Sequence, residues 1–286
     1  MTPAGRDVFR KARAGAPEGF FAREAAGLDW LCVDGGPRVA RVSDVGPGHL
    51  DLERLAPAAP TPAAARAFGR ALAVLHDVGA DAFGAGPTAA WGWSGTPDGW
   101  FGPLDDPLPM AGGAWATWPE FYADARLRPL LDQGRDRGVF TDDDARRVDA
   151  VRALLPRLAG AAADDEPARL HGDLWSGNVM WVRPAHPGDE PPAHPGDEPP
   201  ADAVEAALID PAAHGGHRET DLAMLDLFGA PHLAEIRAGY QEVHPLAPGW
   251  QHRVRLHQLY PLAMHAVLFG GSYVSATRSL LTELTA

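Results

Sequence analysis

The residues best placed to do chemistry lie in one polar stretch with apolar flanks, from Leu170 to Trp181. Its text, LHGDLWSGNVMW, places His171, Asp173 and Asn178 at the spacing H-x-D-x-x-x-x-N. In phosphoryl transfer this pattern supplies a carboxylate that accepts the proton of an attacking hydroxyl and an amide that reaches a magnesium ion. We predict that Asp173 is the catalytic base and Asn178 a metal ligand. Alone, the pattern also fits a loop with an incidental polar cluster.

A second metal ligand should follow at the end of a short strand. The apolar run from Ala206 to Ile209 has strand length and leads directly into Asp210. Protein kinases place the aspartate of their D-F-G motif at such a position, whereas this sequence reads D-P-A. We therefore predict that Asp210 shares a magnesium site with Asn178 and that the nucleotide is ATP.

The use of lysine and asparagine supports this interpretation. Lys11 is the only lysine among the 25 lysines and arginines, and Asn178 is the only asparagine. The codons of both residues are AT-rich, so we infer a coding bias that removes them wherever arginine, aspartate or serine suffices. Both remaining residues stand where a kinase requires that side chain, which favours a catalytic loop over an incidental cluster.

The elements before the loop should position the nucleotide phosphates. Residues 7–11 are predicted to form a short strand, and residues 18–31 an amphipathic helix with Glu24 inside its apolar stripe. A buried carboxylate needs a partner, and Lys11 is the natural one. We predict an ion pair in which Glu24 holds Lys11 toward the phosphates. An exposed Lys11 and a solvent-facing Glu24 are the alternative.

The text HGDLWSGN, with Trp175 after the leucine, resembles the fructosamine kinase (ketosamine 3-kinase) family, relatives of the aminoglycoside and choline kinases. The resemblance implies an α+β, protein-kinase-like fold with a small antiparallel-sheet N-terminal lobe and a larger, mainly helical C-terminal lobe. It implies transfer of the ATP γ-phosphoryl group to the 3-hydroxyl of a small-molecule or protein-linked ketosamine. An aminoglycoside or amino-sugar phosphotransferase and a catalytically impaired binding protein remain alternatives. Further similar stretches are 118–122, 126–129, 216–224 and 268–273.

The predicted domains are an N-terminal lobe over residues 1–55, a Pro/Ala linker over 56–62 and a catalytic lobe over 63–286. Strands are expected at 37–43 and 49–55, and helices at 63–78, 118–134, 141–158 and through much of 231–284. Glu53 to Leu55 would form the hinge, whose backbone groups bind the adenine edge. Residues 82–116 are expected to be an ordered loop, whose aromatic residues either stack on a sugar or hold the loop in place.

Several residues are candidates for substrate contact or support. Trp175 is expected either to stack on the sugar or to pack locally. His217, Arg218 and Glu219 precede a predicted helix and are candidates for facing the substrate. Asp221, near the start of that helix, is expected to brace the catalytic loop, as a carboxylate at this position does in the related kinases. His76 is expected to be structural.

A perfect tandem octapeptide, AHPGDEPP, occupies residues 185–200 between the two proposed metal ligands. Its prolines and acids disfavour a packed element, and we interpret it as slack in a hairpin loop rather than a metal site. Asn178 and Asp210 are 32 residues apart, and removing the 16 repeated residues leaves a separation that suits a hairpin.

The overall charge narrows the range of partners. The formal charge of −13 and pI near 5.3 argue against nucleic-acid and anionic-membrane surfaces, which require clustered positive charge. The single cysteine, Cys32, lies between apolar residues and is predicted to be a buried thiol. No apolar run approaches 18 residues, and we expect a cytoplasmic monomer.

The beginning of the sequence is short for a kinase, because only ten residues precede Lys11. No glycine-rich phosphate loop fits there. Either the natural start lies further upstream, or the chain is truncated and impaired. Both alternatives predict an exposed edge on the first strand and weak ATP binding.

Overall fold

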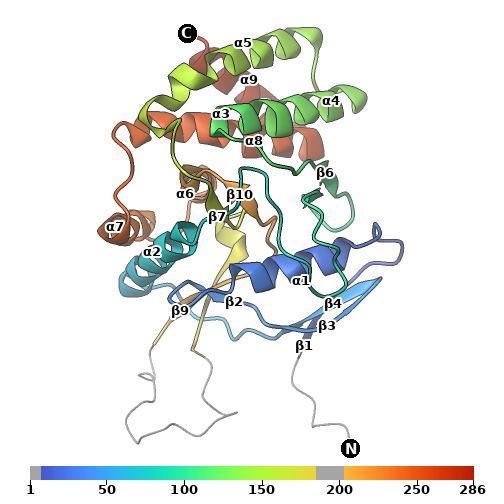
Figure 1. Ribbon diagram of the computed structural model, residues 1–286, viewed down its shortest axis with the longest axis vertical. Helices are drawn as coiled ribbons and strands as arrows, with labels where there is room; N and C mark the ends of the chain where they lie inside the picture. Colours follow the sequence, from blue (N-terminus) through green and yellow to red (C-terminus); the bar gives the residue numbers. More distant parts are fainter. Residues whose placement is uncertain (1–7, 185–202) are drawn as a thin grey trace, which may run out of the picture.

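The computed structural model describes residues 8–184 and 203–286. A small sheet with one long helix lies against a larger, mainly helical part, and the predicted catalytic loop lies between them (Figure 1). This is the expected α+β, protein-kinase-like architecture. The tandem octapeptide falls outside the described residues.

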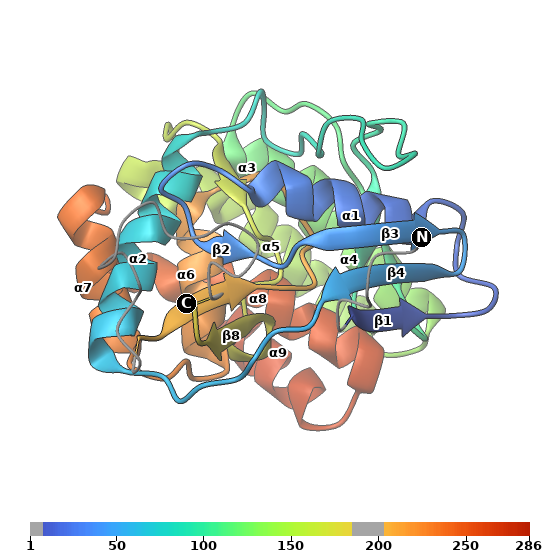
Figure 2. The ribbon, with the colours of Figure 1, turned by 90° about the horizontal axis from the view of Figure 1, so that it is seen from below.

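The N-terminal sheet forms from alternating strands that bury one face against a helix. Strands β1 (Val8–Ala12), β4 (His49–Glu53) and β3 (Val42–Gly46) are antiparallel in the order β1-β4-β3, and Figure 2 shows them side by side. Leu50 and Leu52 of β4 pack against Phe21 and Leu28 of α1 (Phe20–Leu31). Among the described strands β1 pairs only with β4, and the Phe9 side chain on it is half exposed.

A second small sheet connects the N-terminal segment to the catalytic loop. Strand β2 (Arg38–Val39) runs parallel to β9 (Glu205–Leu208), which is antiparallel to β8 (Val179–Val182). The strand expected at 37–43 is therefore two strands, β2 and β3, which belong to different sheets. The Pro/Ala segment is attached to this sheet by a backbone hydrogen bond, in which the Ala58 amide donates to the Trp181 carbonyl of β8 at 2.8 Å.

The helical part begins with α2 (Pro62–Asp77), for which the Thr61 hydroxyl accepts the Ala64 amide at 3.1 Å as an N-cap. Helix α5 (Asp142–Ala159) begins with a reciprocal capping box between Thr141 and Asp144. The remaining helical segments are α3 (Trp118–Phe121), a π-helix η1 (Tyr122–Leu127), α4 (Arg128–Asp136), η2 (Gly160–Ala162), η3 (Ser176–Asn178), α6 (Arg218–Leu227), α7 (Leu233–Val243), α8 (Trp250–Phe269) and α9 (Ser272–Leu284). The remaining strands are β5 (Gly99–Phe101), β6 (Leu108–Met110), β7 (Ala168–Leu170) and β10 (His214–Gly216).

Two expectations about local structure are wrong. The region 82–116 contains a β5–β6 hairpin, which pairs Trp100 with Pro109, rather than loop alone. Cys32 is exposed at the end of α1, because the apolar stripe of that helix ends at Leu31. In the described part of the chain, no helix combines the length and apolarity that crossing a membrane requires.

Helices α2 and α7 approach so closely that glycine is required at their contact. A β-carbon at Gly69 would overlap the carbonyl oxygen of Ile236, and one at Gly239 would overlap that of Arg66. Gly27 in α1 differs, because a β-carbon there would meet Ala213 at 3.4 Å, an ordinary contact.

We expect Gly69→Ala to lower the free energy of unfolding by about 1–3 kcal/mol or more, because the backbone atoms it meets cannot move aside easily. The matched substitution Gly27→Ala should raise it by up to about 1 kcal/mol, the helix preference of alanine over glycine. Urea unfolding of both variants checks the pair. Equal effects of the same sign would contradict the packing described for α2 and α7.

Candidate active site

One ammonium group joins three segments at the centre of the site. Lys11 Nζ on β1 lies 2.8 and 2.9 Å from the two carboxylate oxygens of Glu24 on α1 and 3.0 Å from Asp210 Oδ1. The predicted Lys11–Glu24 pair is therefore present. Burial acts to lower the pKa of Lys11, but the two carboxylates outweigh it and raise that pKa. Burial and the negative charge of Asp210 raise the pKa of Glu24, although the Lys11 ammonium opposes this shift.

The predicted base lies at the bottom of the catalytic loop. The Asn178 amide nitrogen donates to the Asp173 backbone carbonyl at 2.8 Å and to its carboxylate at 3.0 Å. Burial raises the pKa of Asp173 to about 7, and the negative charge of Asp210 adds to this, while the hydrogen bond from Asn178 opposes it. The carboxylate is therefore more basic than an exposed aspartate and is held in one orientation.

The proposed metal ligands face each other across the loop. Asp210 follows β9 with a backbone φ of 54°, a left-handed conformation that aspartate tolerates better than most residues, and Pro211 follows it. The Asn178 amide nitrogen donates to Asp173 and, at 3.5 Å, to the Asp210 backbone carbonyl, which leaves its amide oxygen without a hydrogen-bond donor among the described residues. An amide oxygen and a carboxylate are hard oxygen ligands of the kind magnesium prefers, so these residues fit that ion.

Asp221 at the start of α6 braces the catalytic loop, as expected from the sequence. Its two carboxylate oxygens accept the amides of His171 at 2.8 Å and Gly172 at 3.0 Å. The buried His76 joins the same carboxylate at 3.2 Å and the Tyr240 hydroxyl at 2.8 Å, which confirms a structural role. Hydrogen bonds and imidazole partners lower the pKa of Asp221, although burial alone would raise it.

His171 connects the catalytic loop to the segment that ends in Asp210. Its Nδ1 accepts the Asp173 amide at 3.2 Å, so its Nε2 carries the proton and donates to the Ile209 carbonyl at 2.9 Å. Burial lowers the pKa of His171, which keeps the ring neutral and preserves this tautomer. The positions of Asp173 and Asp210 are therefore coupled through one imidazole.

A cleft of about 300 Å³ opens beside these groups. It is lined by the polar groups Lys11, Glu24, Asp173, Asn178 and Asp210, together with apolar side chains from α1, the β5–β6 hairpin and the end of α8. The Trp175 side chain is 40% exposed on its wall, and a β-carbon at Gly177 would overlap the Trp175 ring. The glycine of this loop thus allows the indole to lie close to the backbone.

Three residues that line the cleft were missed by the sequence reasoning, namely Arg23, His265 and Phe269. Arg23 carried a signal, since it is a charged residue beside Glu24 on the apolar face of α1. Trp100 and Phe101 line the cleft, whereas Trp91 bonds to Asp29 and Trp93 packs against Arg23, so the loop aromatics are divided between the two expected roles.

His217, Arg218 and Glu219 do not line this cleft, and contact between them and a substrate stays a prediction. His217 caps α6, with its Nδ1 accepting the Glu219 amide at 3.2 Å. Glu219 is paired with the buried Arg253 at 2.5 Å, and Arg218 bonds to Asp77 at 2.8 Å.

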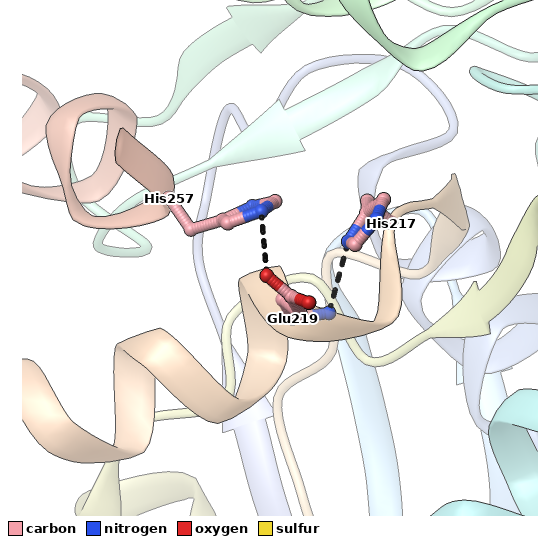
Figure 3. Close-up of side chains that lie close together, drawn as sticks. All are labelled: His217, Glu219 and His257. Atoms are coloured by element: carbon pink, nitrogen blue, oxygen red, sulfur yellow. Dashed lines mark hydrogen bonds and ion pairs between the residues drawn. The ribbon is translucent and has the colours of Figure 1, made fainter. Parts of the chain in front are cut away.

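The close-up in Figure 3 shows Glu219 between His217 and His257, a grouping with the composition of a metal site. The hydrogen bonds argue for a structural role. Because Nδ1 of His217 accepts an amide proton, its own proton lies on Nε2, which faces Asp165 at 3.3 Å rather than offering a lone pair. The carboxylate of Glu219 is held by Arg253 through both oxygens, which places a positive charge beside any cation.

The predicted hinge lies at the end of β4, outside the lining of the cleft. The Glu53 carboxylate bonds to Arg38 at 3.0 Å and to the Arg41 amide at 3.1 Å, so its side chain supports the strands rather than the nucleotide. Leu55 follows the strand and is partly buried. Adenine recognition by backbone groups at 53–55 remains a prediction.

The fold of this chain is found in a solved structure of a distantly similar protein. The choline kinase LicA from Streptococcus pneumoniae has the same fold, with a TM-score of 0.56 and 13% identity over 99% of this chain and 87% of that one. A protein-kinase-like fold is therefore shown.

More similar proteins define the family. A family model described as fructosamine kinase matches residues 1–286. A solved "putative fructosamine-3-kinase" from Thermobifida fusca is 43% identical with a TM-score of 0.80, covering 98% of this chain and 86% of that one. A "probable ketoamine kinase" from Synechocystis is 31% identical over 267 residues, 92% of this chain and 78% of that protein. The chain therefore belongs to the fructosamine kinase family and is a phosphotransferase.

The shared ammonium predicts strong coupling between Lys11 and Glu24. Lys11→Met should lower the free energy of unfolding by about 3 kcal/mol, because it leaves Glu24 buried without a counter-charge. The double variant Lys11→Met, Glu24→Gln should lose about 1–3 kcal/mol less than the sum of the two single variants. Urea unfolding of the natural protein, the two single variants and the double variant gives the four free energies that this double-mutant cycle needs. Additive losses would show that the two side chains act independently.

Proposed function

We propose that this protein transfers the γ-phosphoryl group of ATP to the 3-hydroxyl of a ketosamine of the fructosamine or ribulosamine type. The observation that carries the proposal is the position of Asp173, a carboxylate with a raised pKa that is hydrogen-bonded to Asn178 and lines the cleft beside Trp175. Membership of the fructosamine kinase family supports the class of acceptor. We place the activity in the cytoplasm, with removal of sugar adducts from amines as its purpose.

We assign a part of the reaction to each residue. Asp173 orients the acceptor hydroxyl and takes its proton as a bond forms between that oxygen and the γ-phosphorus. The bond from the γ-phosphorus to the β–γ bridging oxygen breaks, ADP leaves, and Asp173 later releases the proton to water. Lys11, held by Glu24, binds the phosphates. Asn178 and Asp210 would hold magnesium, which neutralises phosphate charge when bound. Backbone groups at Glu53 to Leu55 bind the adenine edge.

Trp175 favours a ketosamine over the aminoglycoside alternative. An indole close to Gly177 on the wall of the cleft offers an apolar face to the ring carbons of one sugar. Asp173 is then directed at a single hydroxyl, and Lys11, Asn178 and Asp210 serve the phosphates. Stacking on the acceptor sugar is therefore the role we propose for Trp175.

A coupled assay of ADP release tests the proposal against a panel of ribulosamine, fructosamine and aminoglycoside acceptors. We expect magnesium-dependent turnover with a ketosamine and phosphate on its 3-hydroxyl, located by NMR of the product. Turnover restricted to aminoglycosides would favour the alternative substrate class. Nucleotide binding without turnover of any acceptor would identify an impaired kinase.

Asp173→Asn should lower turnover by about two to four orders of magnitude, the usual value of a positioned general base. The free energy of unfolding should be unchanged or higher, because the substitution removes a charge whose burial raises its pKa. Asp132→Asn on the surface of α4 is the matched control and should alter neither quantity. Turnover of Asp173→Asn near that of the natural protein would remove Asp173 from the mechanism.

A further inference from the structure

Arg23 is a buried cation on the wall of the active-site cleft. Its side chain comes from α1, one residue before Glu24, and only 4% of the residue is exposed. Its Nε donates to the Asp98 carbonyl at 3.1 Å and its Nη2 to the Ala213 carbonyl at 2.8 Å. The guanidinium therefore lies between the β5–β6 region and the segment that follows Asp210.

The partners of this guanidinium are neutral. Within residues 8–184 and 203–286, no carboxylate forms a hydrogen bond or ion pair with Arg23, and its Nη1 has no hydrogen-bond partner. The buried Arg253, by contrast, is paired with Glu219 through two nitrogens. A buried charge without a counter-charge is costly, so its retention beside a cleft points to an anion supplied from outside.

The surroundings of Arg23 strengthen its need for an anion. Burial lowers its pKa to about 10, and repulsion from the nearby Arg126 contributes. Arg126 is itself buried, bonds to carbonyl oxygens and does not line the cleft. The exposed Asp98 carboxylate, which accepts the Gly112 amide, acts to raise the pKa of Arg23, but burial and Arg126 lower it more. Of Arg23 and Arg126, Arg23 is the one that a ligand in the cleft can reach.

We propose that Arg23 binds a carboxylate of the acceptor, so that the preferred substrates are ketosamines formed on the α-amino group of free amino acids. This inference rests on the proposed ketosamine kinase activity and deepens it. In such an adduct the carboxylate is one carbon away from the amine that carries the sugar. A guanidinium binds a carboxylate through parallel, charge-assisted hydrogen bonds, and Nη1 of Arg23 has its donors available.

The charge of the acceptor explains the preference. The amine of a ketosamine is a cation, and placing a lone ammonium close to a buried guanidinium is unfavourable. An α-carboxylate makes that end of the acceptor zwitterionic and turns the repulsion into attraction. The adduct of a lysine side chain in a protein carries the ammonium without an adjacent carboxylate. The cleft should therefore discriminate between these two kinds of ketosamine.

The nucleotide phosphates are the other anions in such a site, and we assign them to a different side of the cleft. Successive helix residues point about 100° apart. Glu24 faces Lys11 and Asp210, the predicted phosphate side, whereas Arg23 faces the carbonyls of Asp98 and Ala213. Arg23 is accordingly assigned to the acceptor half of the cleft.

The natural protein tests the inference with a matched pair of acceptors, the fructosamine of glycine and that of glycinamide, in the ADP-release assay. The two differ only in the carboxylate, so we expect kcat/KM to be about 10- to 100-fold higher for the glycine adduct, as a charge-assisted hydrogen bond implies. Equal values would overturn the role of Arg23 and leave the proposed function intact. No turnover of either adduct, nor of the matching ribulosamines, would instead overturn the proposed function.

Variants identify the residue responsible. Arg23→Met should reduce the glycine-to-glycinamide ratio to about 1, chiefly through KM for the acceptor, and Arg23→Lys should give an intermediate ratio. Arg146→Met, which removes an exposed arginine paired with Asp143 on α5, is the control and should preserve the ratio. A merely structural role would lower kcat/KM for both adducts equally. A rise in KM for ATP with an unchanged ratio would assign Arg23 to the nucleotide, and either result contradicts the proposal.

Discussion

The shared ammonium of Lys11 is the interaction on which the rest of the site depends. It joins β1, α1 and the residue that follows β9, three segments that are far apart in sequence. Since Glu24 and Asp210 have only one positive charge between them, removal of Lys11 would leave two carboxylates close together. The relative position of the small sheet and the catalytic loop is therefore set partly by electrostatics and not by apolar packing alone.

The buried carboxylate of Asp221 holds the backbone of the catalytic loop in place, as the Lys11 ammonium holds the side chains of Glu24 and Asp210. It accepts the amides of His171 and Gly172, and His171 then bonds to the carbonyl just before Asp210. Hydrogen bonds compensate the desolvation of Asp221, which explains why its pKa is lowered while burial raises that of Asp173. Asp221 on α6 and Asp173 in the loop thus have opposite electrostatic character, the first structural and the second basic.

Charge balance in the cleft connects this machinery to its substrates. Its lining brings the carboxylates of Glu24, Asp173 and Asp210 together with the cations Lys11 and Arg23. Lys11 is neutralised within the protein, whereas Arg23 has only carbonyl partners among the described residues. The inner wall therefore combines the groups proposed for phosphoryl transfer with a cation that we assign to the acceptor.

The sequence by itself determined the residues that act locally or through fixed spacing. The separation of Asp173 and Asn178 within one loop, the placement of Asp210 at the end of an apolar strand and the scarcity of lysine were sufficient to predict which side chains meet. Helix starts at Thr61 and Thr141 were equally readable, because a cap needs only its own first turn. These features depend on contacts within a few residues or on a pattern that one motif contains.

Only the tertiary structure decided where side chains from separate segments point. His217, Arg218 and Glu219 are polar residues near the loop in sequence, yet their partners Asp77, Asp165 and Arg253 come from other elements and hold them away from the cleft. Cys32 looked buried from its neighbours and is exposed, since the helix ends just before it. Arg23 can be recognised as an unneutralised cation only when the positions of Asp98 and Ala213 are known. The burial and pairing of a charge depend on elements distant in sequence, and no local pattern specifies them.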